Sequence, residues 1–420
     1  MIKLFFGLAG FFLVAGIPIA VTIGLAAMIY IMASGTSTHI ITQRLFAGID
    51  STALMAIPFF ILAGDLMNRG GLAKRIINLA NVLVGRSTGG LAIVTILGCM
   101  FFAAISGSGV ATAAAMGCIM VPAMVNKGYD RTFATSVVAA GSPIGVIIPP
   151  SISFIIYGVL AQCSITDLYK AGIPAGIIVG IALMITAVLI SRKHGYRGDD
   201  TVFAWSTVGR SIVDAAWALG TPIIIVGGVF GGIFTPTESA VVAVVYSVLV
   251  GLFIYRDLNF KELPAVFLAA GKTTARIMFI ISCATLFVYV ITYNRIPQMI
   301  VDTFLGLTDN TIILLLIINI ILLIAGTFME TGAILLITVP LFLPLILKMG
   351  VDPVHFGIII TVNTAIGLMT PPFGVCLFTS ASVSGVPVAT LSRRVLIFLV
   401  AQLIALGLIT YVPSLVMFLV

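Results

Sequence analysis

Glycines and prolines interrupt two long apolar runs of this chain, and small polar residues accompany them. One interruption reads GSPIGVIIPPS at 141–151, and the other reads NTAIGLMTPPFG at 363–374. In hydrocarbon, the backbone N–H and C=O groups that such a break frees must find partners in protein, water or a ligand. Matching breaks in two halves of a chain therefore indicate a binding site near the middle of a membrane. Two independent proline kinks are the plainer alternative.

A Gly-Ser turn divides a second pair of apolar arms. It reads SGSG at 106–109, and the corresponding stretch of the other half reads AGTFMETGAILL at 325–336. An arm of about 17 residues rises about 25 Å, which is short for a perpendicular membrane crossing. A re-entrant hairpin fits these arms. Two full crossings joined by a short loop return the chain to the same side and fit equally well.

The four interruptions bring together oxygen atoms that carry no charge. Backbone carbonyls and small polar side chains are hard ligands that suit an alkali cation, while N–H groups at helix N-termini suit a carboxylate. An isolated Ser or Thr in a membrane helix usually bonds its own backbone, so the hypothesis rests on the clustering. The side chains concerned are Ser106, Ser108, Ser142, Thr327, Thr331, Asn363 and Thr364.

Three acidic residues fall within or beside apolar segments. Glu330 stands at the second hairpin turn and is a functional candidate because ionisable groups at such depth are costly; a carboxylate at a wet hairpin tip is the alternative. Glu238 follows Thr235 and Pro236, which is the pattern of a capping box and favours a structural role. Asp65 lies near a helix end within reach of Arg69 and water, and we assign it no chemistry.

Composition places all these residues in a membrane protein. The chain has 420 residues, of which 60% are hydrophobic and 8% charged, and a mean hydropathy of +1.25. Residues 2–33 are apolar, are not a cleaved signal peptide, and cross the membrane once or twice. Residues 37–51 are mildly amphipathic and suit the membrane interface. Further crossings are predicted at 52–68, 132–161, 171–191, 216–234, 236–255, 272–292, 354–383 and 395–415, with two returning pairs at 89–125 and 311–347.

Basic residues are distributed unequally between the two sides of this topology. One side carries only Arg44, Lys170, Arg295 and Lys348. By the positive-inside rule the other, more basic side faces the cytoplasm. Its residues are Arg69, Lys74, Arg75, Arg86, Lys127, Arg131, Arg192, Lys193, Arg197, Arg210, Arg256, Lys261, Lys272, Arg276, Arg393 and Arg394.

A shift of 222 residues lays the second half of the chain over the first. It pairs Gly128 with Gly350, and Pro149 and Pro150 with Pro371 and Pro372. The loop at Gly128 lies inside in the predicted topology and the loop at Gly350 lies outside, so the two repeats are inverted. This is the plan of many secondary transporters.

Several function classes find no support in the residues. The five cysteines lack metal spacing and are expected to be small core residues. The three histidines are scattered, and the chain has no phosphate-binding loop or nucleophile elbow. An enzyme is therefore not expected, nor is a bound cofactor or a nucleic-acid partner. An ion channel with a carbonyl-lined filter stays open as an alternative, and an intramembrane enzyme ranks last because Asp65, Glu238 and Glu330 lie on different segments.

Four motifs in order, AISGSGVATAAAMG, GSPIGVIIPPSI, GGIFTPTES and NTAIGLMTPPFGV, resemble the large membrane subunit of the tripartite ATP-independent periplasmic (TRAP) transporters. The resemblance covers nearly the whole chain. It implies an all-α polytopic protein of the bacterial inner membrane with inverted repeats, two re-entrant hairpins, two broken transmembrane helices and an elevator mechanism. It also implies sodium-driven import of an organic acid, such as a C4-dicarboxylate or sialic acid.

The resemblance further implies partners and site residues. The partners are a small four-helix membrane subunit, expected as a separate polypeptide, and a periplasmic substrate-binding protein. A self-sufficient sodium-coupled dicarboxylate carrier is the nearest alternative. We expect substrate contacts at Ser108, Pro149, Pro150, Thr370 and Pro371. Sodium is expected at Ser106, Gly107, Ser108, Gly109, Gly141, Ser142, Gly145, Gly326, Thr327, Met329, Glu330, Thr331, Asn363, Thr364 and Gly367.

These implications divide the chain into five parts. The hairpins and broken helices would move as one unit, and the remaining helices would form a static scaffold. Bound sodium would raise the affinity of the moving unit for the anion. The predicted parts are a scaffold helix region and arm at 1–51, first-repeat transport elements at 52–170, scaffold helices at 171–292, second-repeat transport elements at 293–394, and a C-terminal scaffold helix at 395–420.

Overall fold

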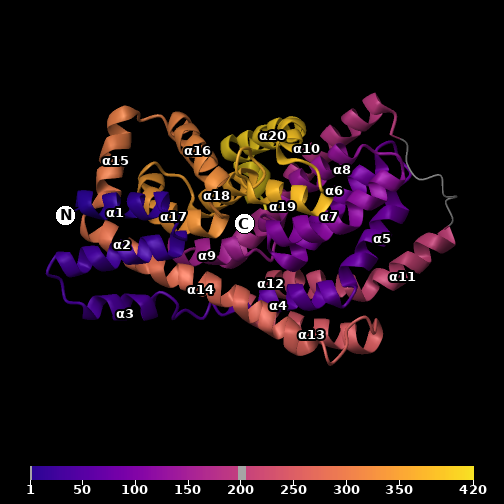
Figure 1. The fold of residues 1–420 in the computed structure, drawn as a ribbon, viewed down its shortest axis with the longest axis horizontal. Helices are drawn as coiled ribbons and strands as arrows, with labels where there is room; N and C mark the ends of the chain where they lie inside the picture. The colour runs from indigo at the N-terminus through magenta and orange to yellow at the C-terminus, as the bar shows by residue number, and fades with distance from the viewer. Residues whose placement is uncertain (1, 197–204) are drawn as a thin grey trace.

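The computed structural model describes residues 2–196 and 205–420, and these form helices and turns without a β-strand (Figure 1). Arg197, one of the predicted cytoplasmic residues, lies outside the described residues. The first helices are α1 (Ile2–Val14), α2 (Ile19–Ala33), α3 (His39–Ala47), α4 (Ala56–Arg69), α5 (Leu72–Val84), α6 (Gly90–Ser106), α7 (Gly109–Asn126), α8 (Arg131–Gly141), η1 (Ser142–Val146), α9 (Ile152–Ala161), α10 (Ile165–His194) and α11 (Trp205–Pro222). The others are η2 (Ile223–Gly227), α12 (Gly228–Phe230), α13 (Pro236–Leu249), η3 (Val250–Ile254), α14 (Leu263–Tyr293), α15 (Ile296–Leu307), α16 (Thr311–Phe328), α17 (Thr331–Lys348), α18 (Pro353–Gly367), α19 (Val375–Ser384), α20 (Val388–Tyr411) and α21 (Ser414–Met417).

Eight helices of the described residues are long and apolar enough to cross a membrane. Their outer surfaces fit lipid rather than water. On α10 the side chains of Ile177, Ile181, Ile185 and Leu189 are 42 to 60% exposed, and their spacing of four residues puts them on one face. A stripe of this kind meets hydrocarbon favourably, so the fold is that of a polytopic membrane protein.

The two predicted repeats have the same succession of elements. In the first, the hairpin α6–α7 precedes α8, which passes through the 3-10 turn η1 and an irregular segment into α9. In the second, the hairpin α16–α17 precedes α18, which ends at Gly367, and α19 begins at Val375. The Pro149–Pro150 and Pro371–Pro372 peptide bonds at the equivalent breaks are both cis. The predicted all-α fold with two broken helices is confirmed.

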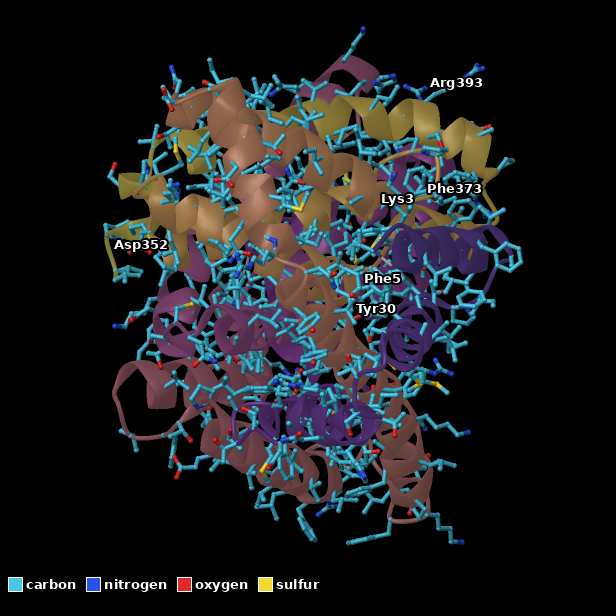
Figure 2. The ribbon with its side chains drawn as sticks, turned by 90° about the vertical axis from the view of Figure 1, so that its left-hand side faces the viewer. Lys3, Phe5, Tyr30, Asp352, Phe373 and Arg393 are labelled. Atoms are coloured by element: carbon cyan, nitrogen blue, oxygen red, sulfur yellow. The ribbon has the colours of Figure 1, made fainter. Side chains whose placement is uncertain are left out.

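Each broken helix begins with the same cap. The Asp130 carboxylate accepts a hydrogen bond from Phe133 N at 2.9 Å, and the Asp352 carboxylate accepts bonds from Val354 N at 2.7 Å and His355 N at 3.2 Å. Asp352 lies at the edge of the molecule in Figure 2. An N-cap oxygen pairs N–H groups that have no partner within the helix, which fixes where α8 and α18 begin.

Asp352→Ala is expected to lower the free energy of unfolding by about 1 kcal/mol, because it leaves two helical N–H groups to water. The midpoint of thermal unfolding in detergent measures this change. Asp352→Asn keeps an acceptor at the same position and should stay within a few tenths of a kcal/mol of the unchanged protein. Equal stabilities of the alanine and asparagine variants would show that the cap is not needed.

Several backbone groups at the broken helices are paired within the bundle. Ser151 Oγ donates to the carbonyl oxygen of Val146 at 2.6 Å, and Cys376 N donates to that of Leu368 at 2.8 Å. Gln402 of α20 donates from Nε2 to the carbonyl oxygen of Ala140, near the end of α8, at 2.9 Å. Neighbouring protein therefore makes the interruptions tolerable within a membrane.

Two short helices account for residues 2–33, where the sequence left one or two crossings open. At 13 and 15 residues, α1 and α2 each rise only about 20 Å. Figure 2 shows Phe5 of α1 close to Tyr30 of α2, and their ring centroids are 6.0 Å apart. Phe5 also contacts Phe287 of α14, with ring centroids 5.6 Å apart. Aromatic packing thus anchors this N-terminal pair to α14.

The helices α5 and α15 were missed by the sequence analysis, which treated their residues as connections. On α5 the buried residues Leu72, Ile76, Ile77 and Ala80 follow the spacing of an amphipathic helix. Arg75 on the same helix bonds Asp257 at 2.5 Å, and its guanidinium lies 3.7 Å from the Tyr255 ring centroid. The α5 helix is thereby fixed to the segment that precedes α14.

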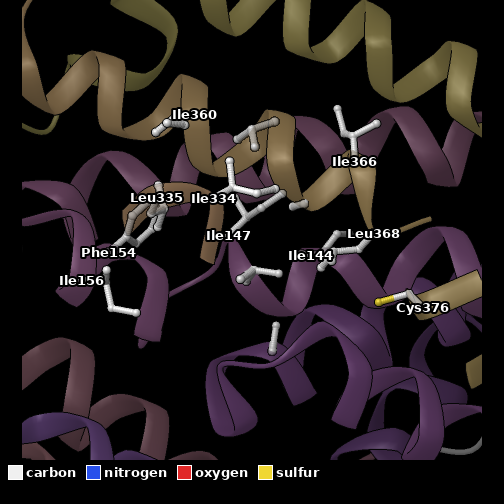
Figure 3. Packing of buried hydrophobic residues seen from close by; sticks show 14 of the residues in the cluster. Ile144, Ile147, Phe154, Ile156, Ile334, Leu335, Ile360, Ile366, Leu368 and Cys376 are labelled. Carbon is white, nitrogen blue, oxygen red and sulfur yellow. The ribbon is translucent and has the colours of Figure 1, made fainter. Parts of the chain in front are cut away.

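The main core joins the two repeats to each other. Figure 3 shows Ile144, Ile147 and Phe154 of the first repeat facing Ile334, Leu335 and Leu368 of the second, and all belong to one buried cluster. The helices α10 and α20 pack against the broken helices, whereas α4 packs with α13 and α14 along the lower edge in Figure 1. The predicted placing of 395–420 in a static scaffold stays a prediction.

Candidate functional site

A cavity of about 210 Å³ lies where the two hairpin turns approach helices α4 and α14. Its walls come from four parts of the chain. Residues 106–111 of the first hairpin and 330–333 of the second line one side, together with the beginning of α9. Residues of α4 between 61 and 68 and residues of α14 between 273 and 281 line the other. The cavity thus lies between the two hairpin turns on one side and helices α4 and α14 on the other.

Three helices point their N-termini at this cavity. The helix α7 begins at Gly109, α9 at Ile152 and α17 at Thr331, and all three residues line it. The first N–H groups of a helix have no partner within it, and the helix dipole adds partial positive charge there. No Lys or Arg is among the described lining residues. Backbone N–H groups are therefore what this cavity offers to an anion.

Glycine lets the first hairpin turn approach the break in the α8–α9 segment. Gly107 has a positive φ of 59°, and a Cβ on it would lie 3.0 Å from the carbonyl oxygen of Pro150. A Cβ on Gly145 would lie 2.9 Å from the carbonyl oxygen of Ser108. The stretches 106–109 and 141–145, which both carry expected sodium positions, are therefore in contact, and the contact needs glycine.

Hydroxyl groups at the first turn are held by the backbone. Thr112 Oγ1 donates to the carbonyl oxygen of Ser108 at 2.8 Å, and Ser106 Oγ lies 3.2 Å from Thr112 Oγ1. Ser142 Oγ donates to the carbonyl oxygen of Ala139 at 3.3 Å. A hydroxyl that donates to a carbonyl keeps lone pairs on its oxygen, so these side chains are still able to accept a hydrogen bond or bind a cation.

The second hairpin meets its broken helix through two glycines. A Cβ on Gly367 would lie 2.5 Å from Gly326 Cα, and a Cβ on Gly326 would lie 2.9 Å from Gly367 Cα. Only the absence of side chains permits α16 and α18 to come this close. The stretches 326–331 and 363–367, which also carry expected sodium positions, are thus in contact as well.

Asn363 is the most constrained polar side chain of the second break. It is fully buried, and its Nδ2 donates to the backbone oxygen of Asn319 at 2.9 Å and to Asn319 Oδ1 at 2.7 Å. Asn319 Nδ2 in turn lies 3.3 Å from Thr410 Oγ1 of α20. The Oδ1 atom of Asn363 has no hydrogen-bond partner among the described residues. Such a buried, unpaired acceptor calls for a ligand or water.

At the second hairpin turn, two adjacent residues line the cavity in different ways. Glu330 precedes α17, is exposed, and accepts no capping hydrogen bond from that helix. Thr331 is 1% exposed, and its Oγ1 has no partner within the described part of the chain. The turn therefore presents a carboxylate to the cavity and keeps an unpaired hydroxyl behind it.

The predicted site residues fall into three groups. Those that line the cavity are Ser106, Gly107, Ser108, Gly109, Glu330 and Thr331. Those that lie outside its lining, in the hairpin ends and broken helices, are Gly141, Ser142, Gly145, Gly326, Thr327, Met329, Asn363, Thr364 and Gly367. The substrate positions other than Ser108, namely Pro149, Pro150, Thr370 and Pro371, do not line this cavity.

Helices α4 and α14 contribute polar lining residues that the sequence analysis missed. They are Asp65 and Asn68 of α4 and Thr273 of α14. The spacing of Asp65 and Asn68 puts both on one helix face, which was the available signal. The sequence assigns Asp65 no chemistry, because it lies near a helix end within reach of Arg69 and water.

Glu238 has the structural role that its sequence context predicted. Thr235 Oγ1 accepts from Glu238 N at 3.3 Å, and Glu238 Oε2 accepts from Thr235 N at 2.8 Å. This reciprocal pair is a capping box at the start of α13. Glu238 does not line the cavity, so it is not part of the site.

Comparison with known proteins identifies the family. A model of the tripartite ATP-independent periplasmic transporter, DctM component, matches residues 6–415. The chain belongs to this family. It is therefore the large permease subunit of a TRAP transporter, a multi-pass protein of the inner membrane and not an enzyme, as the resemblance implied.

Relatives of known name differ in the solutes they are named for. The isethionate TRAP transporter permease protein DctMQ of Oleidesulfovibrio alaskensis is 45% identical over 98% of this chain, which spans 65% of that longer protein. The C4-dicarboxylate large permease protein DctM of Pseudomonas aeruginosa is 42% identical over 92% of this chain and 91% of its own length. The sialic acid large permease protein SiaM of Vibrio cholerae is 37% identical over 99% and 97%.

A solved structure shares the fold at low sequence identity. The YdaH transporter of Alcanivorax borkumensis superimposes with a TM-score of 0.65 over 89% of this chain and 87% of its own, at 15% identity. The likeness supports the arrangement of helices described above and carries no information on the solute.

Proposed function

We propose that this TRAP permease imports an organic anion, driven by a sodium gradient, with solute delivered by a periplasmic binding protein and with a small membrane subunit as partner. The observation that carries the proposal is the cavity at which both hairpin turns and three helix N-termini meet. The family is established for the chain, whereas the coupling ion, the solute and the partners are inferred.

The helix N-termini suit the cavity to an anion, whereas the Glu330 and Asp65 carboxylates in its lining oppose one unless a cation is bound beside it. The N–H groups at the beginnings of α7, α9 and α17 are suited to carboxylate or sulfonate oxygens, although one of those in α7, Ala111 N, already donates to Ser108 Oγ. Relatives are named for isethionate, C4-dicarboxylates and sialic acid, which are all organic anions. Backbone N–H groups bind carboxylate and sulfonate oxygens alike, so the cavity does not distinguish these solutes by their anionic group. The binding protein is expected to discriminate between the remaining parts of the solutes.

Sodium fits the oxygen atoms around the hairpin turns. Asn363 Oδ1 and Thr331 Oγ1 are buried and have no partner in the described structure, and Ser106 and Ser142 keep lone pairs on their hydroxyl oxygens. Neutral oxygens suit an alkali ion, whose charge would then lie beside the anion cavity. Bound sodium would raise anion affinity by this proximity, which is the differential binding that coupling requires.

The geometry of the turns favours re-entrant hairpins. The bases of the two hairpins lie on opposite sides of the predicted membrane topology, yet both turns line one cavity. If each hairpin crossed the membrane fully, the turns would emerge on opposite faces and could not meet. This meeting of the turns supports re-entrant hairpins, which an elevator would carry as a unit past α4 and α14.

Uptake of labelled isethionate, a C4-dicarboxylate and sialic acid into proteoliposomes tests the proposal. The vesicles hold the chain and its small subunit, and each assay is run with and without an inward sodium gradient and the binding protein. Uptake of at least one solute should need both. Uptake with sodium alone would favour a self-sufficient carrier, and unsaturable flux without a gradient would favour a channel.

A further inference from the structure

The wall of the cavity opposite the hairpins carries one charge. Among the described lining residues of α4 and α14 the polar side chains are Asp65, Asn68 and Thr273, and only Asp65 is ionisable. Asp65 is half-buried and forms no ion pair or hydrogen bond with a described residue. The charge of Arg69, one helical turn away, attracts the Asp65 carboxylate without bonding it, so the carboxylate still acts on whatever occupies the cavity.

Asp65 and Glu330 differ in the part of the protein that holds them. Glu330 belongs to the second hairpin turn and would travel with the solute. Asp65 belongs to α4, which packs with α13 and α14, so here we place α4 with the scaffold and not with the transport elements predicted at 52–170. Figure 1 shows α4 and α14 on the opposite side of α9 from α18 and α20. On the elevator hypothesis Asp65 lines the cavity in the state described here. When the hairpins move to the opposite side of the membrane, Asp65 stays in place and no longer lines the cavity.

The position of Asp65 indicates which state this is. It lies one helical turn before Arg69, the last residue of α4, on the side that the distribution of Lys and Arg assigns to the cytoplasm. Thr273 likewise follows Lys272 in the first third of α14. On the predicted topology the cavity therefore lies towards the cytoplasmic side, as expected of the state in which the solute leaves.

We propose that Asp65 is a release residue on the cytoplasmic side, whose negative charge lowers the affinity of the cavity for an anion only after the site has moved inward. The inference rests on the proposed function. A fixed carboxylate repels a bound anion and attracts a cation within the same water-filled space. Because α4 stays behind, the affinity of the outward-facing state is left high and release on the cytoplasmic side is faster, while the sodium gradient alone sets the direction of net transport.

The test measures solute affinity from the two sides separately. Binding protein added only outside proteoliposomes restricts uptake to permeases whose periplasmic face points outward. In these vesicles the internal solute concentration that gives half-maximal exchange reports the cytoplasmic side, and the external concentration of loaded binding protein reports the other. Asp65→Asn should lower the internal value about tenfold, on the order expected for one unit charge nearby, and leave the external value within about twofold.

Three variants separate a charge effect from a packing effect. Asp65→Glu keeps the charge and should restore the internal value of the unchanged protein. Asn68→Asp adds a charge to the same helix face and should raise that value several-fold. Asp302→Asn removes an exposed carboxylate of α15 outside the cavity lining and should change neither value. The internal sodium concentration for half-maximal exchange should rise in Asp65→Asn, opposite in sign to the change for the anion.

Equal shifts on both sides, or no shift in Asp65→Asn and Asn68→Asp, would overturn the inference. Failure of the unchanged protein to take up any anion with sodium and binding protein would instead contradict the proposed function. If Asp65→Asn does not fold, Asn68→Asp alone still tests the inference. It is predicted to raise the solute concentration for half-maximal exchange, and to do so only on the cytoplasmic side.

Discussion

Gly367→Ala is expected to abolish sodium-driven uptake, with a loss of more than about a hundredfold. The added Cβ would lie 2.5 Å from Gly326 Cα, 2.6 Å from its carbonyl carbon and 2.9 Å from its oxygen. All three are backbone atoms, so no side-chain rotation relieves the overlap, and α16 must move away from α18. A displacement of about 1 Å in a preorganised site costs on the order of a hundredfold in function.

A second glycine provides the matched control. A Cβ on Gly407 of α20 would meet nothing within 4 Å, and alanine is the better helix former by about 1 kcal/mol. Gly407→Ala should therefore transport normally and unfold at the same or a slightly higher temperature. Uptake rates and unfolding midpoints of both variants decide the matter. Full uptake by Gly367→Ala would show that the close contact of α16 and α18 is dispensable.

The repeat and its breaks could be predicted because they leave local signals. Gly107, Pro150 and Pro372 interrupt apolar segments. The shift of 222 residues aligns the two halves of the sequence without any knowledge of the fold. The caps at Asp130 and Asp352 and the box at Thr235 likewise depend on neighbours within three residues. Backbone N–H and C=O groups in hydrocarbon must be paired close to where they lie. The residues around a helix break therefore reveal the break in the local sequence.

The far wall of the cavity could not be predicted in this way. Asp65 and Thr273 are separated from each other and from both hairpin turns by long stretches of chain, and no repeat relates them. Asn319 was missed for a similar reason, since its partners Asn363 and Thr410 lie on two other helices. Contacts between helices far apart in the chain depend on packing. Helical periodicity predicts which face of a helix is buried, but not which other helix packs against that face.

Asn363→Ala is expected to raise the sodium concentration for half-maximal uptake by roughly thirtyfold, a loss of ~2 kcal/mol. Its amide is fixed by two bonds to Asn319, which leaves Oδ1 as a buried acceptor without a partner among the described residues. An oxygen held in this orientation needs no reorganisation to meet an ion, and alanine removes it. Asn363→Asp keeps an oxygen but loses both donated bonds, so it should weaken sodium binding as well.

Thr338→Val separates this effect from the general cost of removing a buried polar group. Thr338 Oγ1 is almost fully buried and donates at 2.7 Å to the carbonyl oxygen of Ile334 in its own helix. Such a hydroxyl serves the backbone and not a ligand, so the variant should keep the sodium dependence of the unchanged protein. If Asn363→Ala and Thr338→Val shift the sodium requirement alike, Asn363 supports packing and the ion lies elsewhere. A shift in Asn363→Ala alone, at unchanged unfolding temperature, assigns the unpaired amide oxygen to the coupling ion.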